Sequence, residues 1–382
     1  MCYTSVIVKE KRHEVNYSSY KFRIYPNKLQ QEKIEATFKA CCYVWNALLE
    51  KKIKAYERRG EFLTAFQGMS YLTKMKTYTP WLNNCNRNAL DKEIENLQEA
   101  YKSFFRRAKN GHEAVGFPKF KKCVNSYRTT GCIHLENNYV KIPNIGRVKK
   151  GEKNYKIDGE IVEIIVLKTK TNKYFAVLHY KKESQEILSP SSEDIGLDMG
   201  IKEFMIDSNG HKYEQPFYLK KNLKKLKREQ RKLSRKKYNS KNYKKQKQKI
   251  RKIYEKIVNQ RNYFLHCLSK KIINKYQNIF IEDLSIKEME HSKKIRSNMK
   301  DIGWYTFTEY LLYKSLWYGR TLKKINRFYP SSQICSTCGY KNTELKNLNI
   351  RTWECPLCRV KHDRDINAAK NILLKGKKDL TK

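Results

Sequence analysis

Two CxxC pairs near the C-terminus constrain the folding of this chain more than any other feature. The pairs are separated by 16 residues and consist of Cys335, Cys338, Cys355 and Cys358. Thiolates at this spacing form two rubredoxin-like turns that close a tetrahedron of sulfurs around one zinc ion. Because four thiolates leave no open position, the spacing predicts a structural Zn²⁺ site, with an iron–sulfur or redox site as the alternative.

The chain of 382 residues is strongly basic. Its formal net charge is +44, from 82 Lys and Arg against 38 Asp and Glu, and its 27 tyrosines are interleaved with the cations. This favours a polyanionic partner, because cations neutralise phosphates and aromatic rings stack on bases. No stretch approaches about 18 apolar residues and no secretory signal opens the chain, so no membrane partner is expected. With an odd count of 11 cysteines, this predicts a cytoplasmic, nucleoid-associated protein.

The N-terminal half reads as a β-rich segment interrupted by helices. Ser19–Tyr25 alternates apolar and basic residues, which predicts a half-buried strand. Asn27 and Gln30 predict a capping box that opens a helix ending at Gly60. Two further helices and a group of short strands follow, at 63–78, 86–109 and 127–180. We interpret the strands as a small antiparallel barrel or sandwich that the first strand could complete, with the helices as an insertion.

The C-terminal half carries its most basic stretch between apolar strands. Residues 220–256 hold nineteen Lys or Arg against two Glu, which predicts a basic helical hairpin lining an anionic partner. A strand–turn–strand segment precedes the hairpin, with Asn209 and Gly210 in the turn. Another apolar strand and an aromatic-rich helix at 304–318 follow it. This order of elements is typical of an RNase H-like, RuvC-type nuclease domain.

Three acids stand at the ends or starts of these elements. Asp198 ends the strand IGLD, Glu282 ends the strand IFIE, and Asp365 opens the helical run INAAKNIL. One such acid alone is more often a cap or a solvated turn residue. Three converging acids would bind two Mg²⁺ ions about 3.5–4 Å apart, a site that hydrolyses phosphodiesters.

These motifs together resemble the TnpB (OrfB) family of insertion sequences, relatives of the type V CRISPR effector nucleases. The matching segments run almost end to end: YKFRIYPNKLQQEKIEATF, GFPKFKK, IGLDMGIKEF, FIEDLS, RFYPSSQICSTCG and HDRDINAAKNIL. The resemblance implies an RNA-guided DNA endonuclease. In the family, a guide RNA from the transposon end pairs with one strand of double-stranded target DNA, and the protein reads a short adjacent motif and cuts both strands. We expect a monomer.

The family's catalytic residues can be carried over by motif. They fall on Asp198, Glu282 and Asp365, which the resemblance makes the Mg²⁺ ligands. Asp363 is the alternative for the third position. Lys202 and Arg364 are candidate phosphate contacts or, equally, surface salt-bridge residues. Between the cysteine pairs lie basic and aromatic side chains of the kind that a zinc ribbon presents to nucleic acid, among them Arg351 and Trp353.

The resemblance also implies an α/β multidomain organisation. It comprises a β-barrel wedge domain with an inserted helical recognition domain, and a RuvC-like nuclease domain with a zinc-ribbon insert that binds target nucleic acid. The expected boundaries are 1–27 and 121–190 for the wedge domain, 28–120 for the recognition domain, 191–330 and 361–382 for the nuclease domain, and 331–360 for the ribbon.

Three other functions stay open at this level. A guide-RNA-dependent DNA-binding regulator would bind its target without cutting it. The three intact acids weigh against this function, because such a regulator would not need them. A tyrosine transposase would need a metal-binding His pair, and the chain contains no HxH. A compact type V CRISPR effector would be distinguished by a CRISPR array beside its gene.

Overall fold

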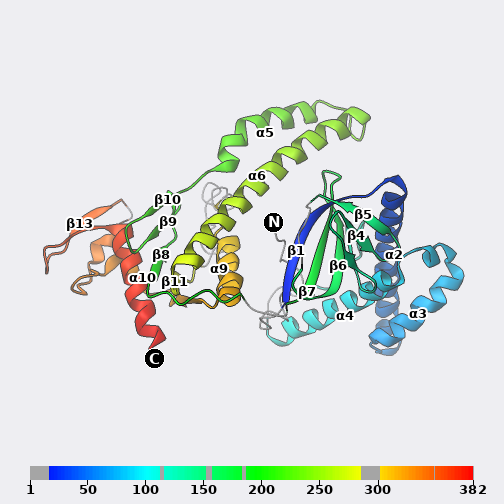
Figure 1. Ribbon diagram of the computed structural model, residues 1–382, viewed down its shortest axis with the longest axis horizontal. Helices are drawn as coiled ribbons and strands as arrows, with labels where there is room; N and C mark the ends of the chain where they lie inside the picture. The colour runs from blue at the N-terminus through cyan, green and yellow to red at the C-terminus, as the bar shows by residue number, and fades with distance from the viewer. Residues whose placement is uncertain are drawn as a thin grey trace. The chain divides into compact units, whose positions relative to one another are not determined.

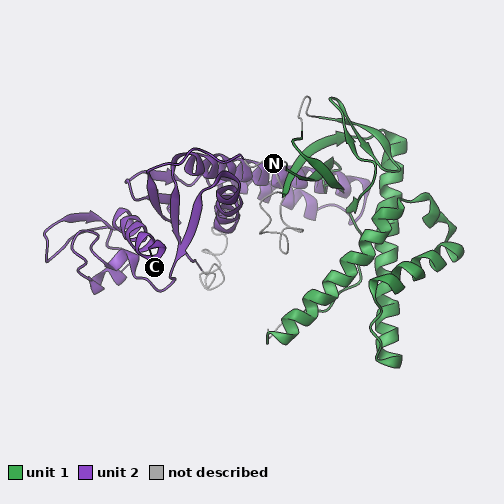
Figure 2. Ribbon diagram, turned by 60° about the horizontal axis from the view of Figure 1, so that its bottom comes forward, with its two compact units in different colours: residues 1–184 green, residues 185–382 purple. Residues whose placement is uncertain are grey.

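The computed structural model divides into two compact units, Met1–Ser184 and Gln185–Lys382 (Figure 2). The residues that it describes are 17–111, 116–151, 157–182, 186–284, 302–347 and 349–381. Most of the predicted first wedge segment, residues 1–16, therefore lies outside the described residues. Within the described part of the chain, no helix is long and apolar enough to cross a membrane.

A seven-stranded antiparallel sheet forms the centre of the first unit, with the strand order β2-β6-β7-β1-β5-β4-β3 (Figure 1). Its strands are β1 (Tyr17–Tyr25), β2 (Ser126–Thr129), β3 (His134–Leu135), β4 (Tyr139–Ile142), β5 (Gly146–Lys150), β6 (Glu160–Lys168) and β7 (Tyr174–Lys181). The strand before the helices thus joins the later strands between β7 and β5. Among the described strands the ladder ends at β2 and β3, so in hydrogen-bonding terms the expected barrel is an open sheet.

Between β1 and β2 the chain forms α2 (Lys28–Arg59), α3 (Ala65–Tyr78), a short 3₁₀ turn η1 (Pro80–Asn84) and α4 (Arg87–Lys109). The predicted capping box is confirmed, because Asn27 accepts from the Gln30 amide and Gln30 accepts from the Asn27 amide. Gly60 ends α2 in the left-handed conformation, at φ 67°. Apolar side chains of α2 and α4 share one core with the sheet.

A mixed five-stranded sheet organises the second unit, in the order β10-β9-β8-β11-β12. Its strands are β8 (Asp194–Asp198), β9 (Glu203–Asp207), β10 (Lys212–Glu214), β11 (Asn278–Glu282) and β12 (Thr321–Ile325). The first three strands form an antiparallel meander that contains the predicted Asn209–Gly210 turn, whereas β8, β11 and β12 run parallel. The helices that follow β10 are α5 (Tyr218–Ser234) and α6 (Lys241–Lys275), which form the predicted basic hairpin.

The two faces of this sheet are covered by different helices (Figure 1). Side chains of α6 and α9 (Trp304–Tyr318) pack on the face that carries Ile195, Leu197, Ile279 and Ile281. On the other face α10 (Arg364–Leu380) packs on Phe280. Because side chains alternate along a strand, Gly196 and Asp198 of β8 belong to the α10 face, as do Phe280 and Glu282 of β11.

A small cysteine-bearing module lies between β12 and α10. It contains the 3₁₀ turns η2 (Ser331–Gln333) and η3 (Thr343–Lys346) and the two-stranded ribbon β13 (Thr352–Glu354) and β14 (Lys361–Asp363). Cys335, Leu345, Trp353 and Cys355 form its own small core. Trp353 is therefore buried in this core rather than presented at the surface, contrary to the sequence-based interpretation.

Gly196 allows α10 to lie directly on β8. A Cβ at this position would come within 2.2 Å of the Ala369 carbonyl oxygen and 2.6 Å of the Leu373 amide nitrogen. Both atoms belong to the helix backbone, so no side-chain rotation could relieve the clash. Gly376 of α10 allows the same close approach from the helix side, because a Cβ there would lie 2.1 Å from the ring of Phe280. Helix and sheet are thus in contact through glycines on both sides.

We expect Gly196→Ala to separate α10 from the sheet and to destabilise the second unit. Overpacking a tight core costs about 1–3 kcal/mol, and the clash with backbone favours the upper end. Thermal or urea unfolding measures the loss. Gly116→Ala is the matched control, because nothing lies within 4 Å of a Cβ at that position; equal stability of the two variants would contradict the close contact.

Candidate active site

The sheet brings two of the three predicted acids to one edge. Asp198 is the last residue of β8 and Glu282 is the last residue of β11. These strands are parallel neighbours with Ile281 opposite Leu197, so their carboxyl ends meet. Side-chain alternation directs both acids to the α10 face. Sequence positions 84 residues apart thus contribute to one site.

Asp365 reaches the same site from the first turn of α10. Arg351, from the cysteine module, donates from Nη1 to both carboxylate oxygens of Asp365 at 3.3 Å. On β11, Glu282 accepts a hydrogen bond of 2.5 Å from the Ser331 hydroxyl. The sequence-based reasoning did not foresee either contact, because each one links the cysteine module to a distant acid.

Asp363 has a different role from its neighbour. It is the N-cap of α10 and accepts from the amides of Asp365 and Ile366 at 3.0 and 3.2 Å, while Lys212 donates to its other oxygen at 2.6 Å. Burial raises the pKa of Asp363, but the Lys212 and backbone hydrogen bonds outweigh it and hold the pKa below its usual range. Both oxygens of Asp363 are thus held more closely than those of Asp365, whose contacts with Arg351 are 3.3 Å long, which favours Asp365 for the third position.

Burial raises the pKa of the two acids at the strand ends. Burial, reinforced by the charges of Glu282 and Asp365, raises the pKa of Asp198 to about 8, although Arg364 and Arg351 oppose the shift. Burial likewise raises the pKa of Glu282, against the Ser331 hydrogen bond. Negative charge is therefore incompletely compensated at this edge of the sheet, and a cation would relieve it.

The two candidate phosphate contacts lie in different environments. Lys202 is exposed in the turn between β8 and β9. Arg364 is 6% exposed and donates to the carbonyl of Asn347 at 3.0 Å. The Arg364 side chain therefore links α10 to the cysteine module. The sequence indicated a phosphate contact or a surface salt bridge for this residue, but not this contact.

The four cysteines form a cluster that could hold a metal ion. Their sulfurs all lie within 4.8 Å of one another, with Cys335 3.6 Å from Cys358 and Cys338 3.5 Å from Cys355. A tetrahedral Zn–S shell with bonds of about 2.3 Å needs sulfurs about 3.8 Å apart, so the donor set fits zinc. His362 Nε2 lies 3.1 Å from the Cys335 sulfur, and the His362 ring packs on Trp353. The cysteine spacing did not predict either contact of His362.

Among the described residues, no group of acids is as close together as these sulfurs. The wider spacing of Asp198, Glu282 and Asp365 has a physical reason. Two ions about 3.5–4 Å apart need room between their ligands, so a two-metal site spaces its carboxylates more widely than four thiolates around a single ion.

Two buried asparagines of α10 fasten the cysteine module to the sheet. Asn367 accepts from the Ser336 amide and donates to the Ile334 carbonyl, and Asn371 donates to the carbonyls of Ser331 and Ile334. The sequence carries a signal for this, because residues four apart share one helix face and buried amides need partners.

Separate segments of the chain resemble known protein families. Three family models match: "Probable transposase" of the OrfB (IS605) group at 177–293, "Cas12f1-like, TNB domain" at 304–372 and "Helix-turn-helix domain" at 17–61. Over 17–61 the structure has the strand β1 and the single helix α2 rather than two helices.

Full-length similarity extends to two relatives and one solved structure. A Streptomyces pristinaespiralis protein named "Putative RNA-guided DNA endonuclease" is 28% identical, over 94% of this chain and 89% of its own. The Escherichia coli protein of the same description, InsQ, is also 28% identical, over 94% and 92%. The Cas12f1 chain of a Cas12f1–sgRNA–target DNA complex superposes with a TM-score of 0.57 at 13% identity, over 93% of this chain and 98% of that one.

The fold thus places this molecule in the class of Cas12f1-like α/β proteins that carry a cysteine metal-binding cluster. Within that class, the chain resembles the OrfB (TnpB) family, through the OrfB (IS605) match at 177–293, the TNB match at 304–372 and the two full-length relatives.

Asp198→Asn tests the electrostatics of the acidic site. The folded pKa of about 8 lies above the unfolded value of about 3.9, so the wild type binds more protons when folded and loses stability as the pH rises toward 8. In Mg²⁺-free buffer, chemical unfolding should show that the free energy of unfolding of the variant, relative to that of the wild type, rises by about 2 kcal/mol between pH 6 and pH 8. Added Mg²⁺ should narrow the difference. A pH-independent difference would contradict the raised pKa.

Metal analysis tests the cysteine cluster. The wild type should contain one zinc per chain, and Cys338→Ala should contain far less than one, because three thiolates hold zinc less tightly than four. Cys123→Ala is the control, since Cys123 is an exposed thiol outside the cluster. Iron or no metal in the wild type would contradict the zinc assignment.

Proposed function

We propose that this chain is an RNA-guided DNA endonuclease whose RuvC-like, RNase H-fold domain is the five-stranded sheet with α6, α9 and α10. The observation that carries this proposal is the convergence of Asp198, Glu282 and Asp365 on one edge of that sheet, where burial and the two neighbouring acids raise the pKa of Asp198. A site built only for stability would not bury like charges together, since their repulsion is unfavourable. Full-length similarity to proteins named RNA-guided DNA endonuclease supports the same function.

The donor set suits Mg²⁺, which prefers carboxylate oxygens and substrate phosphate oxygens. Asp198, Glu282 and Asp365 would hold it. Magnesium at such a site supplies an activated water and stabilises the leaving oxygen of a phosphodiester.

The other residues of the site orient these ligands. The Ser331 hydroxyl fixes the direction of the Glu282 carboxylate. Arg351 pairs with both oxygens of Asp365. A metal ion held by Asp365 would compete with this ion pair, and the guanidinium would then be available to a phosphodiester beside it. Asp363 and Lys212 keep the first turn of α10, and with it Asp365, in position.

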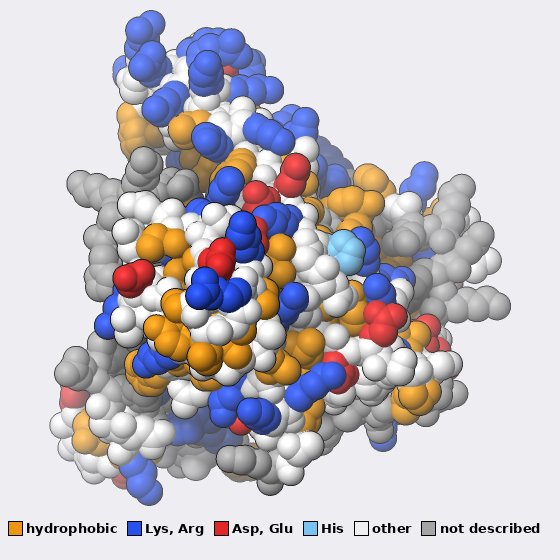
Figure 3. All heavy atoms as spheres, turned by 90° about the vertical axis from the view of Figure 1, so that its left-hand side faces the viewer, with side chains coloured by type: hydrophobic (Ala, Val, Ile, Leu, Met, Phe, Trp, Pro, Cys, Tyr) orange, Lys and Arg blue, Asp and Glu red, His pale blue; other side chains and the backbone are white. Residues whose placement is uncertain are grey.

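The basic helical hairpin is the best candidate for gripping nucleic acid. One side of α5 lines a shallow depression with six cations: Lys224, Lys227, Arg228, Arg231, Lys232 and Arg235. Glu229 pairs with two of them, Arg228 and Lys232, and leaves the surface strongly positive. In Figure 3 the upper part of the molecule, where this hairpin lies, is covered mainly by Lys and Arg. Such a surface neutralises phosphates irrespective of base sequence.

We assign the remaining parts by the same family resemblance. The seven-stranded sheet would act as the wedge domain, and the helices between β1 and β2 as the recognition domain for guide RNA and target DNA. The cysteine module, 331–360, would hold target nucleic acid over the acidic site, to which Arg351 and Ser331 tie it.

Purification with co-expressed RNA from the flanking element, followed by incubation with a library of target-adjacent sequences and Mg²⁺, tests the function. The expected result is cleavage of both strands beside one short motif, with Asp198→Ala inactive. Binding of target without cleavage by the intact protein would instead favour the regulator. A CRISPR array beside the gene would favour the compact effector over the transposon protein.

A pair of matched variants separates the two neighbouring acids. Asp365→Asn should lower the cleavage rate at least about a hundredfold, because it removes a metal ligand. Asp363→Asn should cleave at nearly the wild-type rate, because asparagine caps a helix about as well as aspartate and only the Lys212 pair is lost. Single-turnover cleavage with saturating RNA measures both. The reverse order of activities would assign the third ligand to Asp363.

A further inference from the structure

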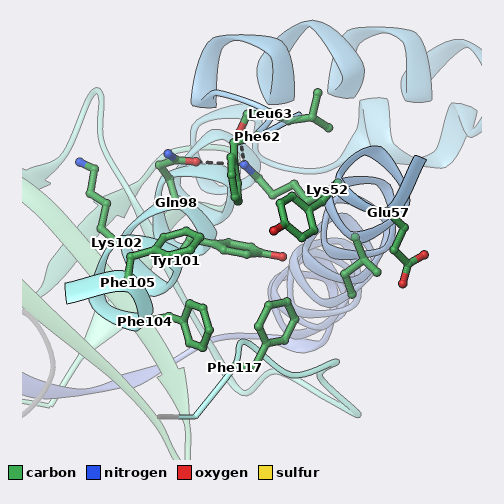
Figure 4. A pocket seen from close by; sticks show the side chains of 12 residues that line it. Lys52, Glu57, Phe62, Leu63, Gln98, Tyr101, Lys102, Phe104, Phe105 and Phe117 are labelled. Atoms are coloured by element: carbon green, nitrogen blue, oxygen red, sulfur yellow. Dashed lines mark hydrogen bonds between the residues drawn. The ribbon is translucent and has the colours of Figure 1, made fainter. Parts of the chain in front are cut away.

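An aromatic pocket lies in the first unit, far along the chain from the acidic site. It is formed by six rings from two helices and two loops and encloses about 620 Å³ together with polar side chains at its margin. The rings, called the aromatic pocket below, are Tyr56, Phe62, Tyr101, Phe104, Phe105 and Phe117. Tyr56 comes from the end of α2, Phe62 from the loop to α3, three rings from α4, and Phe117 from the loop after α4. Figure 4 shows the labelled rings facing a common space.

These rings hold one another mostly edge to face. Ring centroids lie 5.3 Å apart for Phe62 and Phe105, at 85°, and 5.5 Å apart for Tyr101 and Phe117, at 89°. Phe104 and Phe117 pack at 5.3 Å and 85°. Such packing gives the walls a fixed geometry and leaves ring faces free for a flat guest.

The aromatic pocket is far more exposed than a core. Tyr56 and Phe62 are 55% and 58% exposed, and Phe105 and Phe117 are both 43% exposed. A contiguous exposed apolar surface of this kind marks a binding site in a soluble protein. Of the six rings only Tyr101 belongs to the buried core that joins α2 and α4, so the four exposed rings are not needed to hold the helices.

The charged residues of the lining are Lys52, Lys102 and one acid, Glu57, and basic residues end both helices that supply the rings. Arg58 and Arg59 occupy the last turn of α2, and Arg106, Arg107 and Lys109 occupy the last turn of α4. Within the aromatic pocket itself, the buried ammonium of Lys52 donates to the Leu63 carbonyl and to Gln98 Oε1 (Figure 4). An ammonium has three N–H donors, so these two contacts leave one for an acceptor on a guest.

We propose that the aromatic pocket binds an unpaired nucleobase of the guide RNA, stacked between rings, with its flanking phosphates on the arginines at the ends of α2 and α4. The inference rests on the proposed function, since it presumes a guide RNA. Ring faces with adjacent cations are the combination that single-stranded nucleic acid requires. A protein partner would need no such flank of five cations. Guide RNA is preferred over target DNA because it accompanies the protein throughout and so covers the exposed rings permanently.

Substitutions of Phe105 test this site. Its ring is partly exposed, so changes there should leave the fold intact, which a thermal melt checks. Phe105→Ala should weaken guide RNA binding by the full chain about 5- to 150-fold at fixed salt, Phe105→Leu by a similar factor, and Phe105→Trp little, because tryptophan restores a stacking face. The matched control is Phe66→Ala, which removes a ring of the same unit that is 80% exposed and lies outside the aromatic pocket.

A second measurement does not depend on mutation. Guide RNA carrying 4-thiouridine, irradiated in the wild-type complex, should crosslink to peptides within 52–62 or 98–117. Absence of these crosslinks, or equal RNA affinity of Phe105→Ala and Phe66→Ala, would overturn the proposal.

Three other results would also overturn it. Loss of target DNA binding with unchanged RNA affinity would assign the aromatic pocket to DNA. Full retention of RNA affinity by Phe105→Leu would show that apolarity rather than stacking matters. A concentration-dependent dimer of the RNA-free chain, abolished by Phe105→Ala, would make a second copy the occupant. A wild-type chain that binds no guide RNA would instead refute the proposed function itself.

Discussion

The contact of α10 with β8 at Gly196 is the constraint on which the second unit depends. Only a residue without a Cβ lets the helix backbone come this close to the strand. The close contact brings Asp365 to the strand ends that carry Asp198 and Glu282. It also fixes the position from which the side chains of Asn367 and Asn371 donate hydrogen bonds to the cysteine module. One backbone contact therefore positions both the acids and the module above them.

Two parts of the second unit carry charge that nearby groups do not fully compensate. At the sheet edge, burial and the charges of Glu282 and Asp365 raise the pKa of Asp198, and on the α5–α6 hairpin cations greatly outnumber their acidic neighbours. Neither arrangement favours the isolated chain, because like charges repel. Each becomes favourable once an opposite charge arrives, divalent cations at the acids and phosphates on the hairpin. Under the proposed function, the stability that the free protein forgoes at these places would be recovered on binding metal ions and nucleic acid.

Much of the molecule could be predicted from patterns that are local in sequence. The capping box at Asn27, the helix end at Gly60 and the turn at Asn209 depend on residues within a few positions of each other. The metal cluster follows from cysteine spacing, because each CxxC turn presents two sulfurs by itself. Acids at the ends of apolar strands could be placed at one edge once those strands were taken as parallel neighbours.

What the sequence by itself determined was therefore the list of elements, the four sulfur ligands and the three candidate acids. The tertiary structure alone decided which neighbours those residues meet. Asp363 is engaged by Lys212 and by its own helix, Ser331 holds Glu282, and Arg364 is buried against the cysteine module. The aromatic pocket likewise joins rings more than forty residues apart. Such contacts depend on how distant segments pack, and no spacing along a single chain encodes them directly.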